Sequence, residues 1–186
     1  MVELDMNCNF FAAFLKLYCF HSLMEFKEVV SAVENSTEFK EWRKSNTDFL
    51  AHAFVLLDEA NKNIWQIGYF NEAEKKATTF IFENGVISLV PPQEILESGE
   101  KILALDTEEV KIIVEEAVNI ANEFRKINYP REMIAKTFFI IQKTDLGVVY
   151  NISFFSGSFN VTNIKLSAVD GKILKHDLKA LAGFDK

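Results

Sequence analysis

The chain has 186 residues and is 49% hydrophobic, which supplies a core for one large domain or two small ones. Its formal net charge is −7 and no basic stripe runs through it, so nothing would neutralise a phosphate backbone, and we exclude nucleic acid as a main partner. The two cysteines, Cys8 and Cys19, are too few for a secreted disulfide scaffold, which predicts a cytoplasmic protein.

Residues 1–23 form an N-terminal extension of uncertain status. The stretch Phe10–Phe20 is apolar and aromatic apart from Lys16. Acidic rather than basic residues precede it, unlike in a signal peptide, and it is too short to span a bilayer. We therefore expect no stable insertion into a membrane. Two interpretations stay open: the extension arises from a start upstream of Met24, or it is a short helix that covers an exposed apolar face.

The rest of the chain repeats one pattern. A set of helix-spaced residues recurs downstream in the same order and spacing, and the stretch Phe49–Leu89 reappears in pattern as Met133–Lys175. Such self-similarity predicts two copies of one helix-then-strands unit. We place the first repeat at 24–92, a connector at 93–106 and the second repeat at 107–181. The recurring residues are Val29, Ala32, Val33, Glu38 and Phe39, followed by Val114, Ala117, Val118, Glu123 and Phe124.

Each repeat is expected to contain one helix followed by four strands. Apolar residues at helical spacing predict helices over Met24–Lys44 and Thr107–Ile127. Apolar runs between turn signals predict the strands. The fold class is therefore α+β, with two repeats of a helix and a four-stranded antiparallel meander. The predicted strands are Phe49–Leu57, Ile64–Phe70, Lys76–Phe82, Val86–Val90, Met133–Gln142, Val148–Phe155, Asn160–Ala168 and Lys172–His176.

Strand alternation predicts which residues face the helices. Leu50, Phe54 and Leu56 should share the helix-packed face with the aromatic residues of the second strand. The opposite face is apolar too, which a sheet with one wet face would not show. We expect the other repeat to cover it by packing sheet on sheet, or else a second copy or another protein. Whether the two sheets pack face to face or run on as one continuous sheet stays open. The candidate interaction face consists of Val55, Leu57, Phe139 and Ile141.

Few residues could carry catalysis. Only His21, His52 and His176 would titrate near neutrality, and the chain has no catalytic-triad spacing, phosphate loop or metal-binding pattern. We expect no enzyme, no cofactor and no metal. His52 lies in an apolar strand, so it either lines a ligand site or is an edge residue that limits aggregation, as Lys136 would be in the second repeat. A candidate pocket between helix and sheet comprises His52, Trp65, Tyr69 and Tyr150.

The second repeat resembles a known family. It contains Val149–Ile152, then Asn163–Ala168, then the hairpin Val169–Leu174 with the sequence VDGKIL. This order resembles the PepSY domain, whose hallmark strand is written V-x-V-D-A-x-T-G-x-V-L. Asp170 and Asn84 stand where that family has threonine before the turn glycine. The resemblance implies a PepSY or cystatin-like fold. It also implies a non-catalytic module of the kind found in peptidase propeptides and in membrane or exported proteins, suspected of inhibiting or chaperoning peptidases.

We therefore expect a non-catalytic interaction module that modulates a peptidase or another protein partner, or that associates with itself. The alternative is a small-molecule carrier, or a cone-type α+β enzyme whose apolar pocket lies between helix and sheet, with His52 as its base. The two hypotheses differ in where they place the functional residues, on a sheet face or in a cavity.

Overall fold

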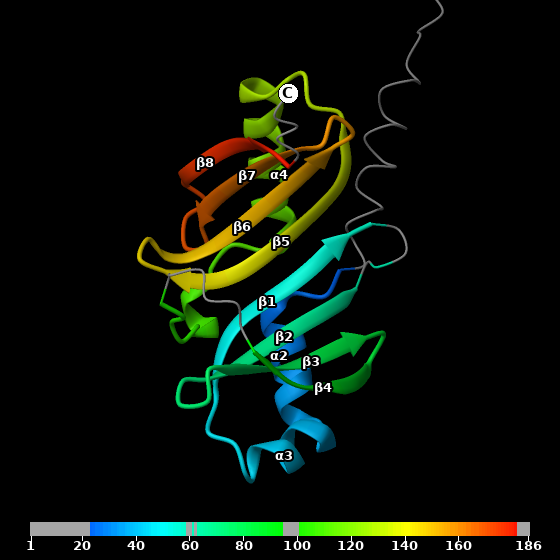
Figure 1. Cartoon of the computed structure of the whole chain (residues 1–186), viewed down its shortest axis with the longest axis vertical. Helices are drawn as coiled ribbons and strands as arrows, with labels where there is room; N and C mark the ends of the chain where they lie inside the picture. Colours follow the sequence, from blue (N-terminus) through cyan, green and yellow to red (C-terminus); the bar gives the residue numbers. More distant parts are fainter. Residues whose placement is uncertain (1–22, 59–60, 62, 95–100, 182–186) are drawn as a thin grey trace, which may run out of the picture.

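One antiparallel sheet contains all the strands of the computed structural model, which describes residues 23–58, 61, 63–94 and 101–181. The strand order is β4-β3-β2-β1-β5-β6-β7-β8 (Figure 1). Two four-strand meanders thus lie side by side in a single sheet. The strands are β1 Phe49–Leu57, β2 Ile64–Asn71, β3 Lys76–Glu83, β4 Val86–Glu94, β5 Ile134–Thr144, β6 Gly147–Ser156, β7 Asn160–Ser167 and β8 Ile173–Ala180.

The predicted fold class, two repeats of a helix followed by a four-stranded meander, is wrong, because all eight strands form a single sheet in which β1 and β5 pair directly. Their ladder runs from His52 opposite Gln142 to Leu57 opposite Thr137. Each of these strands begins its meander and so has one unpaired edge. Joining the two edges satisfies main-chain N–H and C=O groups that sheet-on-sheet packing would leave unpaired. The expected stacking of one half on the other is therefore wrong as well.

The helices are shorter than predicted. The first predicted helix divides into α2 (Phe26–Asn35) and α3 (Thr37–Arg43). Ser36 separates them, because its backbone is extended and its hydroxyl accepts a hydrogen bond from the Phe39 N–H at 3.1 Å. A short 3₁₀ turn, η1 (Thr107–Glu109), precedes α4 (Val114–Asn128), where one continuous helix was expected.

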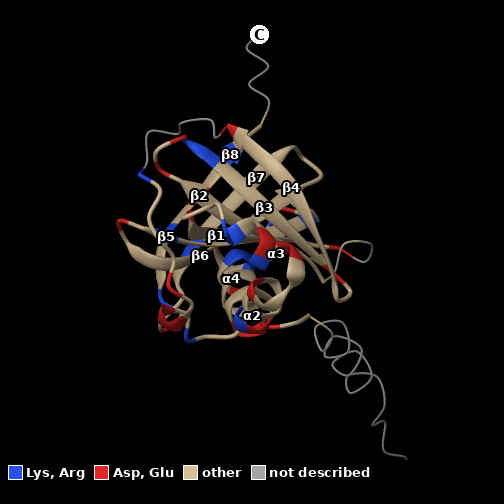
Figure 2. Ribbon diagram, turned by 90° about the horizontal axis from the view of Figure 1, so that it is seen from below, with Lys and Arg blue, Asp and Glu red and all other residues tan. Residues whose placement is uncertain are grey.

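The helices α2 and α4 lie on the same side of the sheet (Figures 1 and 2). The core fills the space between them and the strands, and its largest fully buried side chains include Trp65, Tyr69, Tyr150 and Phe139. Phe26 at the start of α2 stacks on Trp65, with ring centroids 6.4 Å apart. The sheet face beneath α2 and α4 is therefore buried, and no described helix covers the opposite face.

A β-bulge in the first strand of each meander changes the predicted faces. In β1 the register shifts between Leu50, which lies opposite Tyr69, and His52, which lies opposite Gly68. The register of β5 shifts in the same way between Ile134 and Lys136. The extra residue reverses the alternation downstream, so Leu50 shares its face with Ala53 and Val55 rather than with Phe54 and Leu56. The predicted assignment of the two faces is therefore wrong for both strands.

A single carboxylate joins the N-termini of the two long helices. Glu25 caps α2 in a reciprocal capping box with Glu28, and its Oε2 also accepts a hydrogen bond from the Val114 N–H of α4 at 3.3 Å. The ion pair between Lys27 and Glu108, 3.1 Å long, lies nearby in sequence and also links the two halves. Burial raises the pKa of Glu25, since desolvation disfavours its charged form.

Candidate functional site

The predicted interaction face lies mostly inside the protein. Val55, Phe139 and Ile141 are fully buried beneath the helices, and Leu57 is half-buried against the same core. These residues therefore lie on the helix-packed face of the sheet and not on the opposite face, where the sequence pattern places them. The bulges in β1 and β5 are the cause, because they turn the odd-numbered residues toward the helices.

Three of the four predicted pocket residues fill the core instead of lining a cavity. Trp65, Tyr69 and Tyr150 have no exposed surface. The Tyr69 hydroxyl donates to Glu34 at 3.0 Å, and the Tyr150 hydroxyl donates to the Ile112 carbonyl at 3.0 Å. Burial raises the pKa of both phenols, so they remain neutral donors. Their role is to anchor α2 and the start of α4 to the sheet.

His52 lies on the opposite face from these three aromatics. Its imidazole covers Gly68 of the neighbouring strand, so closely that a Cβ on Gly68 would lie 2.2 Å from His52 Cε1. Burial lowers the pKa of His52 below its usual value of 6.5. At neutral pH the ring is therefore uncharged, with one nitrogen able to donate a hydrogen bond and the other able to accept one.

A small pocket adjoins His52 on this side of the sheet. Its volume is about 500 Å³, within the range of small-molecule sites. Gln142, which lies opposite His52 in the β1–β5 ladder, contributes an amide. The lining comes from β1, β3, the end of β5 and the connector, and consists of Ala51, His52, Ala77, Lys101, Ile102, Leu103, Gln142, Lys143, Thr144 and Asp145. The pocket thus differs from the predicted one in both place and composition.

Further along the same face the strands carry an apolar group that we call the open-face cluster, and all of its members are half-buried. Phe138 is at its centre, with ring centroids 5.6 Å from Phe54 and 5.7 Å from Phe155. Phe54 lies opposite Ile140 in the β1–β5 ladder, and Leu56 lies opposite Phe138. None of these side chains belongs to the main core. The cluster consists of Phe54, Leu56, Phe138, Ile140 and Phe155.

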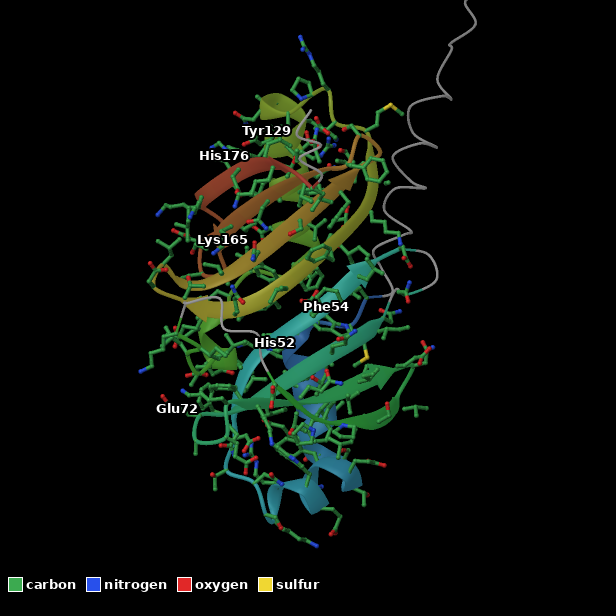
Figure 3. The ribbon with its side chains drawn as sticks, viewed as in Figure 1. His52, Phe54, Glu72, Tyr129, Lys165 and His176 are labelled. Carbon is green, nitrogen blue, oxygen red and sulfur yellow. The ribbon has the colours of Figure 1, made fainter. Side chains whose placement is uncertain are left out.

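Polar and basic residues border the cluster on β6 and β7. Asn163 donates to Ser153 Oγ at 2.9 Å, while Asn151 Oδ1 is buried and has no hydrogen-bond partner among the described residues. Lys165 lies opposite Asn151 in the β6–β7 ladder and opposite Lys175 in the β7–β8 ladder. Figure 3 shows His52, Phe54 and Lys165 on this face. The uncovered face therefore runs from an apolar centre to a basic margin.

Sequence reasoning missed this cluster although a signal for it was present. His52 is the one polar residue in β1, and it shares its face with Phe54. In β5, Lys136 and Gln142 share a face with Phe138 in the same way. The polar residues of a half-buried strand mark its wetter face. Alternation counted from these residues would have identified the uncovered face.

His176, the other histidine among the described residues, makes contacts that stabilise the fold. His176 Nδ1 lies 2.6 Å from the Tyr129 hydroxyl and its ring packs on Phe124, so it holds the end of α4 against β8. In the described part of the chain, no group of three His, Cys, Asp or Glu side chains could hold a metal ion. Cys8, Cys19 and His21 lie outside the described residues. None of the helices over 23–58, 63–94 and 101–181 has the length and apolar character needed to cross a membrane.

Comparison with known proteins identifies a similar fold but no family. No protein-family model matches the chain, and no curated protein matches its sequence significantly. The crystal structure of a candidate lipoprotein from Clostridium difficile 630 is similar, with a TM-score of 0.56 and 14% sequence identity. The alignment covers 87% of this chain and 97% of that one. At this level of identity the likeness concerns the fold alone.

Proposed function

We propose that the protein is a non-catalytic binding module that holds an apolar polypeptide segment on the uncovered face of its sheet. The observation that carries this proposal is the open-face cluster, a contiguous aromatic and aliphatic surface lying opposite the helices. Contiguous apolar surface outside a core is typical of interaction sites. Aromatic rings supply much of the binding energy at such sites.

The surroundings of the cluster suit a polypeptide ligand. Polar side chains of β6 and β7 border it, as a polar rim borders the apolar centre of a protein interface. Asn151 Oδ1, buried without a partner among the described residues, could accept a hydrogen bond from a bound main chain. The PepSY resemblance supports a peptidase or its propeptide as the natural partner. The low cysteine content supports a cytoplasmic location.

A binding assay tests the proposal. The probe is a short, uncharged, fluorescent peptide that alternates Phe and Ser, and its anisotropy is followed as the full chain is added. Phe155→Ser should weaken binding about tenfold, because loss of one aromatic anchor costs about 1–2 kcal/mol. The matched control is Phe159→Ser, which changes an exposed phenylalanine in the turn after β6. Equal affinity in both variants would refute the assignment of the site.

A second function is favoured by the pocket beside His52. Its volume of about 500 Å³, its apolar residues Ala51, Ala77, Ile102 and Leu103, and the polar ends of His52, Gln142 and Lys101 suit a small aromatic or aliphatic carboxylate. Ligand-detected NMR with a set of such acids tests this carrier hypothesis. Signals from bound acids should weaken in His52→Ala and Gln142→Leu, and should persist in Phe155→Ser. No signal from any acid with the unmodified chain would refute it.

A further inference from the structure

We propose that one end of the protein docks reversibly on a membrane surface that contains anionic lipid, without spanning the membrane. This role is independent of the proposed function, because it uses the end of the sheet rather than its uncovered face. The docking residues, which we call the tip residues, are large apolar side chains that expose more than half of their surface. They are Ile127, Met133, Phe159 and Leu181.

Main-chain hydrogen bonds hold the tip residues at the same end of the molecule. The Gly157 N–H donates to the Met133 carbonyl at 3.0 Å, which ties the β6–β7 turn to the start of β5. The Leu181 N–H donates to the Phe159 carbonyl at 2.9 Å, which ties the end of β8 to the same turn. The helix α4 also ends here (Figure 1), and Ile127 lies in its last turn.

The tip residues expose far more apolar surface than the fold requires. Exposure of large apolar groups to water is unfavourable, and apolar surface gathered at one place on a protein is typical of a site that meets a partner or a membrane. The exposed fractions are 84% for Met133, 79% for Ile127, 71% for Phe159 and 55% for Leu181.

Phe159 has a backbone conformation that favours a different residue. Its φ is +59°, in the left-handed region, which glycine adopts without strain and which is unfavourable for a bulky side chain. Its ring does not belong to the hydrophobic core of the described residues. Neither the backbone nor the packing therefore accounts for a phenylalanine at this position. A strained residue with an exposed apolar side chain indicates a role in binding.

The turn that carries Phe159 is held by side chains. Glu132 accepts a hydrogen bond from the Ser158 hydroxyl at 2.8 Å and another from Asn160 Nδ2 at 3.1 Å. The Phe159 N–H donates to the Ser156 carbonyl at 3.2 Å. The ring thus extends from an ordered turn, so that docking requires little loss of conformational entropy.

The charge of this end favours an anionic surface. The whole chain has a net charge of −7, but the segments that form the end, 125–136, 156–160 and 178–181, contain five Lys or Arg residues and one Glu. Two of the basic residues pair with acidic neighbours just outside these segments. Arg131 and Lys136 are exposed and have no ion pair among the described residues. Basic residues beside exposed apolar groups are typical of proteins that bind anionic membranes.

A lipid surface fits the tip residues better than a protein partner does. Together the four side chains expose on the order of 500 Å², whereas a protein interface of standard size buries about 800 Å² of each partner. They also come from four separate segments of the chain. A protein partner would need a shape complementary to these separate protrusions, whereas a fluid bilayer accepts them in any arrangement.

Sedimentation with lipid vesicles tests the proposal on the full chain. One set of vesicles is phosphatidylcholine alone, and the other contains about 30% phosphatidylserine. We expect binding to the anionic vesicles that weakens with added salt, and much weaker binding to the neutral ones. Phe159→Ser should weaken binding about tenfold, because it removes an apolar anchor. The matched control is Val86→Ser, which changes a side chain of similar exposure, 69%, at the start of β4.

Two further variants separate docking from a role in the fold. Phe159→Gly should weaken vesicle binding as Phe159→Ser does, yet its midpoint of urea unfolding should equal or exceed that of the unmodified chain, because glycine relieves the strain at positive φ. Changing Arg131→Gln and Lys136→Gln together should weaken binding to the anionic vesicles about tenfold and leave the weak binding to neutral vesicles unchanged.

Four results would overturn the proposal. The first is no binding of the unmodified chain to anionic vesicles, and the second is an equal loss of binding in Phe159→Ser and Val86→Ser. The third is a lower unfolding midpoint in Phe159→Gly, because Phe159 would then serve the fold. The fourth is a dimer in analytical ultracentrifugation that Phe159→Ser dissociates, because the tip residues would then contact a second copy. The Phe–Ser peptide binds elsewhere, so its affinity tests the proposed function separately.

Discussion

Replacing Gly68 with alanine should destabilise the protein, and the loss should depend on His52. The added Cβ would lie 2.2 Å from His52 Cε1 and within 2.7 Å of both ring nitrogens, far inside ordinary contact. The imidazole must then leave its place over the strand. Overpacking of this kind costs about 1–3 kcal/mol. The φ of Gly68 is not in the left-handed region, so alanine also gains about 0.4–1 kcal/mol from lower entropy of the unfolded chain.

The net loss for Gly68→Ala should therefore be about 1–2 kcal/mol. In the His52→Ala background the clash is gone, and the same change should stabilise the protein by about 0.4–1 kcal/mol. Urea unfolding of the four proteins, followed by circular dichroism, gives the coupling free energy of this double-mutant cycle, which we expect to be about 2 kcal/mol. An equal effect of Gly68→Ala in both backgrounds would show that the imidazole does not cover this glycine.

Three further predictions concern stability. Phe139→Ala should lower the free energy of unfolding by about 3–5 kcal/mol, because it leaves a cavity under the helices. Phe159 is 71% exposed, so Phe159→Ala should lower it by less than about 0.5 kcal/mol. Equal losses would contradict the assignment of the core. Because burial lowers the pKa of His52, the unfolded chain takes up its proton first, and stability should fall as pH drops through about 6.5. In His52→Gln that fall should be smaller, and an unchanged pH profile would show that another group causes it. Burial raises the pKa of Glu25, so its charge opposes folding as pH rises past 4.5. The free energy of unfolding of Glu25→Gln, which keeps an acceptor for the Val114 N–H, should equal or exceed that of the unmodified chain at pH 7. Glu25→Ala should lower it by about 1 kcal/mol, and the reverse order of the two variants would contradict this role.

Local patterns identified most strands correctly but not their assembly. The predicted strand Phe49–Leu57 coincides with β1, and the Asn84-Gly85 signal marks the turn between β3 and β4, where both residues have positive φ. The direct pairing of β1 with β5 does not follow from these patterns, because it joins segments far apart in sequence. An apolar strand has the same alternation whether its edge pairs or its face stacks, so the pattern does not distinguish the two arrangements.

The candidate site was predicted poorly for a more specific reason. Ala51 and Ala135 occupy the bulges of β1 and β5, and neither is a glycine or carries another local mark of an irregular strand. One uncounted residue in each strand exchanges the two faces, so the sequence pattern places Val55 opposite the helices and Phe54 beneath them. Ser36 was missed as a helix break because α2 and α3 continue one apolar pattern through it.

The junction between β1 and β5 has a consequence for folding. Every other strand pair of the sheet joins neighbours in sequence, so each meander can form through local contacts. The junction must close over the rest of the first meander, the connector, η1 and α4, which makes its formation the slow, non-local step. Until it closes, two apolar strand edges are open at once, and each is the natural complement of the other. At high concentration during refolding, β1 of one molecule can then pair with β5 of another, and the product is an exchanged dimer.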